Sequence, residues 1–352
     1  MIKKLIIADI KSPNNRGFCT GHFFSVARNY YELFNKETKI LVAGGPIYNG
    51  QFKNIRLNLP YDIMIQGESK CKSKFKYFRN AKVLFEQSHG DIIVIQQGGV
   101  ITSFIAILLF YHKKSRLFLI QYSKEGVSSM AKRLLYTLVK YKIDGIICPN
   151  DMVGNAYGKP YCVVPDYIYI PNTNNKIKTY SEKKYDICFV GRIEEEKGVL
   201  DVAHKIAGTK YKMIIAGKIR DESLQKRLEN LCLNCSNIEL NIGYISDETY
   251  YNILRDSRFC ILNYQGEYSK RSSGVVLDTI FSDVPIVGKR CTALNFVEDN
   301  NVGFIYEDLA KLNLDEVMNE AFYQKCLDNI KTYKQKHSEY KLKLASFLGI
   351  SK

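Results

Sequence analysis

The sequence lacks an apolar run long enough to cross a membrane. The longest, VITSFIAILLFY at 100–111, is shorter than the about 20 residues that a spanning helix needs, and it is predicted to be a buried core helix. The opening MIKKLIIADI has a short apolar run and no small-residue cleavage site after it, so we expect a first strand and not a signal peptide. Any membrane contact is therefore expected to be peripheral.

The sequence also lacks the motifs of several large function classes. No G-x-G-x-x-G follows a strand and no G-x-x-x-x-G-K-[ST] occurs, which argues against dinucleotide binding and P-loop chemistry. We find no H-E-x-x-H, no clustered histidines and no nucleophile elbow. RNP, helix-turn-helix and zinc-finger patterns are absent too, so nucleic acid is not an expected partner.

Paired cysteines are scarce although the chain has ten cysteines. Only Cys232 and Cys235 form a C-x-x-C pair, and a second pair at metal-ligand spacing is missing. We therefore expect free thiols in a reducing cytoplasm and no metal site.

Acidic residues are outnumbered, with 36 Asp and Glu against 51 Lys and Arg and a formal charge of +15. Because unpaired lysines are costly to bury, we expect the surplus on the surface. A basic surface favours nucleotides, nucleic acid or an anionic membrane, and charge alone does not choose among them. Two basic stretches, 70–82 and 128–142, are predicted either to be solvated faces or to dock on anionic lipid.

The chain of 352 residues, 46% of them apolar, has the length of two globular domains. Short apolar runs alternate with amphipathic ones in both halves, which predicts α/β domains with parallel strands and crossover helices. We expect two Rossmann-like doubly wound domains that face a cleft. The predicted parts are a domain at 1–166, a linker at 167–184, a domain at 185–330 and a helical tail at 331–352.

Four segments of the second half follow predicted strands, where ligands bind in such sheets. In FVGRIEEEKGV, Gly191 ends a strand and Arg192 and Lys197 follow, which favours either a phosphate clamp or a strand end with solvated charges. Gly217 ends the strand IIAGK. In GYISDE, Tyr244 and Ile245 form a short turn that faces a nucleobase or merely precedes a capped helix.

The fourth segment, SSGVVLDTIF, places Ser272, Ser273 and Gly274 at a helix N-terminus. Free backbone N–H groups and hydroxyls there bind anions, and glycine lets a diphosphate approach closely. Asp278 lies one turn further on and is placed to accept hydrogen bonds from ribose. The alternative is a serine cap with an acid that complements the helix dipole, but three small residues exceed what a cap requires.

The ordered set GRIEEEKG, IIAGK, GYISDE, SSGVVLDTIFSDVPIVG and FVEDNNVGFIYED, over about residues 185–308, resembles the donor domain of GT-B glycosyltransferases. It is most similar to the retaining glycosyl transferases group 1 (family 4-like). The resemblance implies a nucleotide-diphosphate sugar as donor, an acceptor on the first domain, and no metal or other cofactor. It implies that Arg192 and Lys197 stabilise the leaving diphosphate and that Asp278 binds ribose.

The chain departs from the family at two places. The family carries two acids in an E-x(7)-E pattern, and the first falls on Lys270 here, so Glu267 is the candidate to replace it. Where many members have a histidine in the first domain, this chain has Tyr122 or Lys124 nearby. Gly17, Gly21 and His22 form the first loop, and His22 is predicted to touch the donor phosphate or the acceptor, or to be an ordinary helix residue.

The expected function is transfer of a sugar to a glycan or polyprenyl-linked acceptor in bacterial surface polysaccharide synthesis. The expected location is the cytoplasm, with peripheral contact at the inner face of the plasma membrane. A catalytically silent GT-B-like subunit that binds a partner enzyme or glycan is the alternative, because the first acid and the histidine are missing. A sugar-nucleotide epimerase is disfavoured, since few acids and histidines fall in the predicted cleft.

Overall fold

A computed structural model describes residues 4–13, 22–50, 52, 55–63, 68–96, 98–170, 178–270 and 273–350, with only the backbone for His22, Glu267 and Lys270. The chain divides into two compact units. The first comprises Met1–Ile170 with His337–Lys352, and the second comprises Pro171–Lys336. The predicted tail at 331–352 lies mostly within one helix, α12 (Glu320–Leu348), which begins in the second unit and ends in the first.

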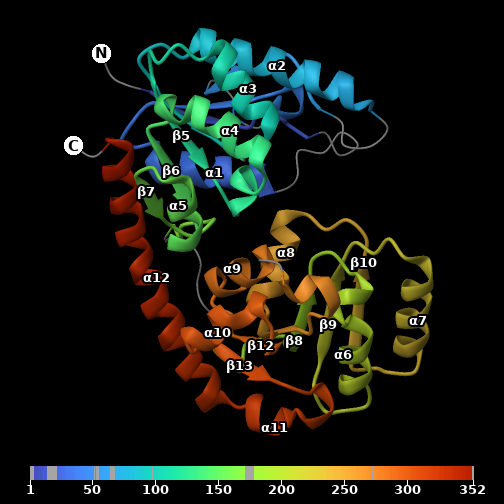
Figure 1. Ribbon diagram of the computed structural model, residues 1–352. Helices are drawn as coiled ribbons and strands as arrows, with labels where there is room; N and C mark the ends of the chain where they lie inside the picture. The colour runs from blue at the N-terminus through green and yellow to red at the C-terminus, as the bar shows by residue number, and fades with distance from the viewer. Residues whose placement is uncertain are drawn as a thin grey trace. The chain divides into compact units, whose positions relative to one another are not determined.

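The first unit is built on a parallel sheet, which has seven strands among the described residues (Figure 1). Its order is β3 (Arg56–Asn58), β2 (Ile40–Gly44), β1 (Leu5–Ala8), β4 (Ile92–Ile95), β5 (Arg116–Ile120), β6 (Gly145–Cys148) and β7 (Tyr161–Val163). The central strands are apolar at every position because helices cover both faces. One face carries α2 (Lys70–Gln87), α3 (Ile101–Phe110), α4 (Met130–Val139) and α5 (Asp151–Tyr157). The other carries α1 (His22–Phe34) and the end of α12.

The second unit repeats this plan with a parallel sheet of six described strands. Its order is β10 (Ile238–Ile242), β9 (Met213–Gly217), β8 (Tyr185–Val190), β11 (Ser257–Leu262), β12 (Ile286–Lys289) and β13 (Gly303–Tyr306). One face packs against α6 (Val199–Ile206), α7 (Glu222–Leu233) and α11 (Leu314–Val317). The other packs against α8 (Asp247–Arg255), α9 (Gly274–Phe281) and α10 (Asn295–Asp299). The predicted α/β class with two doubly wound sheets is confirmed.

Each sheet has a switch point, where the strand order reverses direction. It lies between β1 and β4 in the first unit and between β8 and β11 in the second. In open α/β sheets, ligands bind outside the carboxyl ends of the strands at such points. The segment after β8 is therefore the place to examine for the predicted diphosphate site.

One expectation about the first unit is wrong. The apolar run at 100–111 is not buried all round, because Ile101, Leu108 and Leu109 of α3 are exposed. A helix with apolar residues on every side does not reveal which side meets its neighbours. Within the described residues, none of the helices combines the length and apolar character needed to span a bilayer.

Candidate functional site

Two glycines let the loops after β8 and β9 lie against each other. The N–H of Gly191 donates to the carbonyl of Ala216 (3.0 Å), and a Cβ atom on Gly217 would lie 1.7 Å from the carbonyl oxygen of Gly191. Gly217 also has a φ of +144°, which L side chains rarely adopt. A side chain at 217 would therefore push the segment that begins at Gly191 away from its place.

A second close approach fixes the short helix η4 (Glu195–Lys197) beside the end of β11. Gly198 has a φ of +62°, and a Cβ atom there would lie 2.6 Å from the carbonyl oxygen of Asn263. The N–H of Gln265 donates to the carbonyl of Glu196 at 2.7 Å. The loop that carries Lys197 is thus attached to the strand on the other side of the switch point.

Lys197 is only 3% exposed. Its Nζ lies 4.9 Å from the ring centroid of Tyr268, a cation–π contact. The pKa of Lys197 is lowered to about 8, mainly by burial; Glu194 opposes this shift and Arg192 contributes to it. The site therefore holds a cation whose charge the surrounding protein disfavours.

The other buried lysines show how unusual this position is. Lys142 donates to three carbonyls at the end of α3, Lys183 donates to the carbonyl of Arg255 (2.7 Å), and Lys334 pairs with Asp283 (2.7 Å). Within the described part of the chain, Lys197 Nζ has neither a carboxylate nor a hydrogen-bond partner. Four lysines are therefore buried, and only Lys197 among them lacks a protein oxygen in the described residues, against the expectation that unpaired lysines are not buried.

Arg192 lies in the same loop and differs from Lys197 in exposure. Its guanidinium is exposed and pairs with Glu194 (3.3 Å). An exposed pair of this kind contributes at most about 1 kcal/mol, so the guanidinium can exchange partners at little cost. The structure thus places one buried and one exposed cation in one loop at the carboxyl edge of the sheet.

A chain of contacts joins Lys197 to the start of α9. The rings of Tyr268 and Tyr264 lie 4.9 Å apart, and the Tyr264 hydroxyl is 2.7 Å from Ser273 Oγ. Ser273 is the N-cap residue of α9, but its side chain makes no capping hydrogen bond. A Cβ atom on Gly191 would lie 3.3 Å from Val275. The cationic loop and the helix N-terminus, which the sequence places far apart, are therefore neighbours.

The shape of the first turn of α9 also suits an anion. A Cβ atom on Gly274 would meet no atom within 4 Å, so the space beside this backbone is open. The first N–H groups of a helix have no partner within the helix, and Ser273 Oγ is engaged with a tyrosine instead. The simple reading of Ser273 as a side-chain cap does not hold.

Asp278 lies one turn further along α9 and is half-buried. It accepts hydrogen bonds from the hydroxyls of Tyr250 (3.3 Å) and Tyr251 (3.4 Å), both on α8. Burial raises the pKa of Asp278 to about 6, the two tyrosines lower it, and Asp247 raises it slightly. These bonds are long, so the carboxylate keeps capacity for a better donor.

The turn after β10 lies at the same edge of the second sheet. The N–H of Gly243 donates to the carbonyl of Gly217 (3.0 Å), Tyr244 is exposed, and Ile245 packs against the core. Ser246 Oγ accepts from the N–H of Thr249 (3.1 Å) and caps α8 as predicted. Of this pair, only Tyr244 has a side chain in solvent.

Several predicted site residues lie outside the described residues. Gly17, Gly21 and Ser272 are among them, and for His22, Glu267 and Lys270 the structure gives only backbone, at the start of α1 and in η5 (Gly266–Lys270). Their predicted roles stay predictions.

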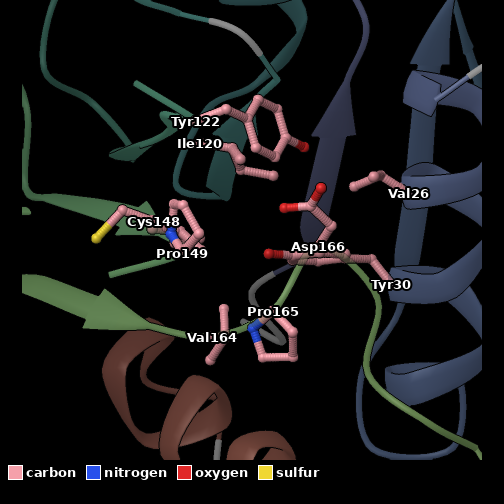
Figure 2. A pocket seen from close by; sticks show the side chains of 10 residues that line it. Val26, Tyr30, Ile120, Tyr122, Cys148, Pro149, Val164, Pro165 and Asp166 are labelled. Atoms are coloured by element: carbon pink, nitrogen blue, oxygen red, sulfur yellow. The ribbon is translucent and has the colours of Figure 1, made fainter. Parts of the chain in front are cut away.

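Tyr122 lines a small cavity in the first unit (Figure 2). The cavity lies at the carboxyl ends of β5 and β6, and Figure 2 shows the carboxyl group of Asp166 and the hydroxyl of Tyr122 directed into the same space. Burial raises the pKa of Tyr122, and Asp166 adds to this. The full lining is Val26, Tyr30, Ile120, Tyr122, Ile147, Cys148, Pro149, Val164, Pro165 and Asp166.

Sequence reasoning missed the tyrosines of the site. Tyr264 and Tyr268 stand four residues apart just before the small-residue segment, and Tyr250 and Tyr251 lie on the preceding helix. The spacing of the first pair is the only signal that could have indicated them. Within the described residues, no group of three or more His, Cys, Asp or Glu side chains is placed to hold a metal ion.

Comparisons with known proteins give matches at the level of structure. No protein-family model matches the chain, and no curated protein is similar to it in sequence. A TarM variant from S. aureus, solved with Fondaparinux, alpha-GlcNAc-glycerol and UDP, superposes with a TM-score of 0.54 and 16% identity over 77% of this chain. The chain spans 59% of that TarM chain.

Two further structures match over nearly their whole length. A trehalose-6-phosphate protein from E. coli, bound with UDP-2-fluoro glucose, has a TM-score of 0.63 and 11% identity, covering 98% of this chain and 99% of its own. The lipopolysaccharide outer core galactosyltransferase WaaB has a TM-score of 0.60 and 11% identity, covering 99% of each chain. These likenesses confirm the predicted GT-B fold.

Proposed function

We propose that the chain is a retaining glycosyltransferase that uses a nucleotide-diphosphate sugar. The observation that carries the proposal is Lys197: a buried ammonium at the switch point, with no oxygen partner among the described residues, beside the N-terminus of α9. A buried cation without an anion is unfavourable, and a bound diphosphate would supply the missing charge. The fold is shared with structures solved with UDP or a UDP-sugar.

The proposed roles follow from where charge develops. As the bond between sugar and diphosphate breaks, negative charge builds on the leaving phosphate, and preorganised donors stabilise it. Lys197 supplies a fixed cation, Arg192 an adaptable one, and the N–H groups at Gly274 supply a helix terminus. Asp278 would exchange its long tyrosine contacts for ribose hydroxyls. We propose no metal or other cofactor for this chemistry.

The acceptor is proposed to bind the first unit, where Tyr122 and Asp166 line the cavity. A glycan or polyprenyl-linked acceptor of surface polysaccharide synthesis is the proposed class, because one structural neighbour is a lipopolysaccharide galactosyltransferase. The cytoplasmic location with peripheral membrane contact belongs to the same proposal. NMR of the product formed from an α-linked donor tests retention, and an inverted anomer would contradict it.

The test of the donor site compares two buried lysines. A thermal-shift screen of UDP, GDP, ADP and CMP first identifies the nucleotide that binds. Calorimetry then measures the affinity of the parent chain, Lys197→Met and Lys183→Met for that nucleotide. Lys183 is the matched control, because it is 6% exposed and burial lowers its pKa to about 8 as well, but it precedes β8 at the opposite edge of the sheet. We expect Lys197→Met to weaken binding at least about tenfold and Lys183→Met to leave it unchanged.

The silent-subunit alternative predicts a different pattern. The departure at Lys270 from the family's acidic pair is the feature that favours it. Transfer or donor hydrolysis by the purified chain, lost in Arg192→Ala and Lys197→Ala, would exclude it. If no nucleoside diphosphate binds, the donor site itself is wrong.

A further inference from the structure

Exposed apolar side chains gather on two neighbouring helices of the first unit. Met130, Leu134 and Leu138 follow one another at intervals of four on α4 and are 87%, 66% and 48% exposed. Because a helix repeats every 3.6 residues, this spacing forms one continuous stripe. Tyr141, three residues after Leu138, extends the stripe and is also exposed.

Helix α3 carries a second stripe beside the first. Ile101, Leu108 and Leu109 are exposed, at spacings of seven and eight that also share one helix face. Helix α3 lies between α2 and α4 on the same face of the sheet (Figure 1). The ends of the two helices are tied together, since Lys113 donates to the carbonyl of Tyr141 (3.1 Å). We call these seven side chains on α3, α4 and the turn after it the apolar ridge.

The charge around the apolar ridge is predominantly positive. Residues 98–143 contain eight Lys and Arg and a single acid, Glu125. Glu125 is itself paired with Lys132 (3.5 Å). Helix α2, on the other side of α3, adds six basic residues and one glutamate. Lys76 and Lys82 are paired with glutamates and Lys142 is buried, but the remaining basic residues still leave an excess of positive charge around the exposed apolar side chains.

We infer that the apolar ridge is a docking surface for an anionic lipid bilayer, into whose interface Leu134 and its neighbours insert. Exposed apolar patches of this kind mark interaction sites. The basic surroundings select the partner: lysines and arginines attract anionic headgroups, while long apolar side chains enter the boundary between headgroups and acyl chains. This inference rests on the membrane contact of the proposed function and names the surface that makes it. Every residue of the apolar ridge belongs to the first unit, so a failure of the vesicle tests would leave the nucleotide-binding tests of the donor site unaffected.

The first test is co-sedimentation of the full chain with phosphatidylglycerol vesicles and with phosphatidylcholine vesicles. We expect binding to the anionic vesicles only. The double variant Leu134→Glu, Leu138→Glu should reduce it at least about tenfold, because it adds charge and removes the inserting groups. The matched control is Leu342→Glu, Leu233→Glu, which changes charge equally at residues 68% and 82% exposed elsewhere and should bind as the parent does.

The second test reports insertion directly. The chain contains no Trp, so Leu134→Trp introduces the only indole. We expect its emission to shift to the blue with phosphatidylglycerol vesicles, and that of Leu342→Trp to stay unchanged. The inference would be overturned by an equal loss of binding in both double variants, or by equal binding to both lipids. It would also be overturned if the chain self-associates and the Leu134→Glu, Leu138→Glu variant abolishes that association, because a second copy would then be the occupant.

Discussion

The two switch points have the same topology and opposite electrostatics. In the first unit, Asp9 follows β1 and Gln96 follows β4, and both side chains are buried. Asp9 accepts from the N–H of Ser12 (3.0 Å) and the hydroxyl of Tyr48 (2.8 Å), and burial raises its pKa. In the second unit, the corresponding edge holds the buried ammonium of Lys197.

This difference shows how two units of the same fold can suit ligands of different charge. The topology places the carboxyl ends of strands where a ligand binds, but the side chains there determine its charge. The amide of Gln96 is buried without a partner in the described residues, and it suits uncharged hydroxyl groups. The second edge suits a diphosphate. The proposed division into acceptor and donor sides follows from this contrast.

The largest expected effect is a loss of stability on glycine substitution, which should be greater at the edge of the second sheet than at that of the first. Gly217→Ala forces a Cβ atom to 1.7 Å from a backbone oxygen at a φ of +144°, so we expect about 3 kcal/mol or more lost from the free energy of unfolding. Gly99→Ala in the first unit meets Gln121 Oε1 at 2.2 Å, the end of a side chain that can move, and should cost about 1 kcal/mol. Urea denaturation measures both, and equal losses would break the contrast.

The second prediction concerns the half-buried Asp278. The pKa of Asp278 is about 6, above its usual 3.8, so its cost to folding is present above pH 6 and disappears as the pH falls towards 4. Asp278→Asn should therefore raise the free energy of unfolding at pH 7 by about 2 kcal/mol, with a gain that vanishes near pH 4. Urea titrations at several pH values check this.

The same variant should bind UDP more weakly, because an amide accepts fewer hydrogen bonds from ribose than a carboxylate. Asp9→Asn is the control in the other unit and should leave UDP affinity unchanged. If Asp278→Asn binds UDP as well as the parent chain does, the proposed ribose contact is wrong.

The sequence contained most of the fold and part of the candidate site. Both sheets could be predicted, because fully buried parallel strands are continuous apolar runs such as LIIA and ICFV. The edge strands β3, β7 and β13 were missed, since each has only three or four residues and too little apolar pattern to detect. Gly191 and Lys197 were found from their place after a strand.

What could not be predicted depends on contacts between distant segments. The burial of Lys197 follows from Tyr268, which lies about seventy residues away in the chain and has no pattern that points to a cation. The tyrosine contacts of Asp278 come from a different helix. The exposure of α3 was hidden because its residues are apolar on every side. Local spacing indicates which element a residue occupies, but not what packs against it.

The third prediction uses the pKa of Lys197, which burial lowers to about 8. Above that pH the free site loses its cation, whereas a bound diphosphate would hold the proton. The affinity for UDP should therefore fall about tenfold between pH 7 and pH 9, or about 1.4 kcal/mol. Calorimetry at both pH values measures it. The pH dependence of UDP affinity should persist in Lys183→Met and flatten in Lys197→Met. If it stays steep in Lys197→Met, another group is responsible for it.

The smallest expected effect on stability is at Gly274. Since a Cβ atom there meets nothing within 4 Å and the residue lies in a helix, Gly274→Ala should change the free energy of unfolding by no more than about 0.5 kcal/mol. The same methyl group occupies the open space where the diphosphate is proposed to approach the backbone, so UDP affinity should fall while urea denaturation stays unchanged. Gly217→Ala should behave differently, because it lowers the free energy of unfolding, and any loss of UDP affinity would follow from that loss. A Gly274→Ala chain that binds UDP normally would place the phosphates elsewhere on the second edge and leave the buried lysine without its proposed anion.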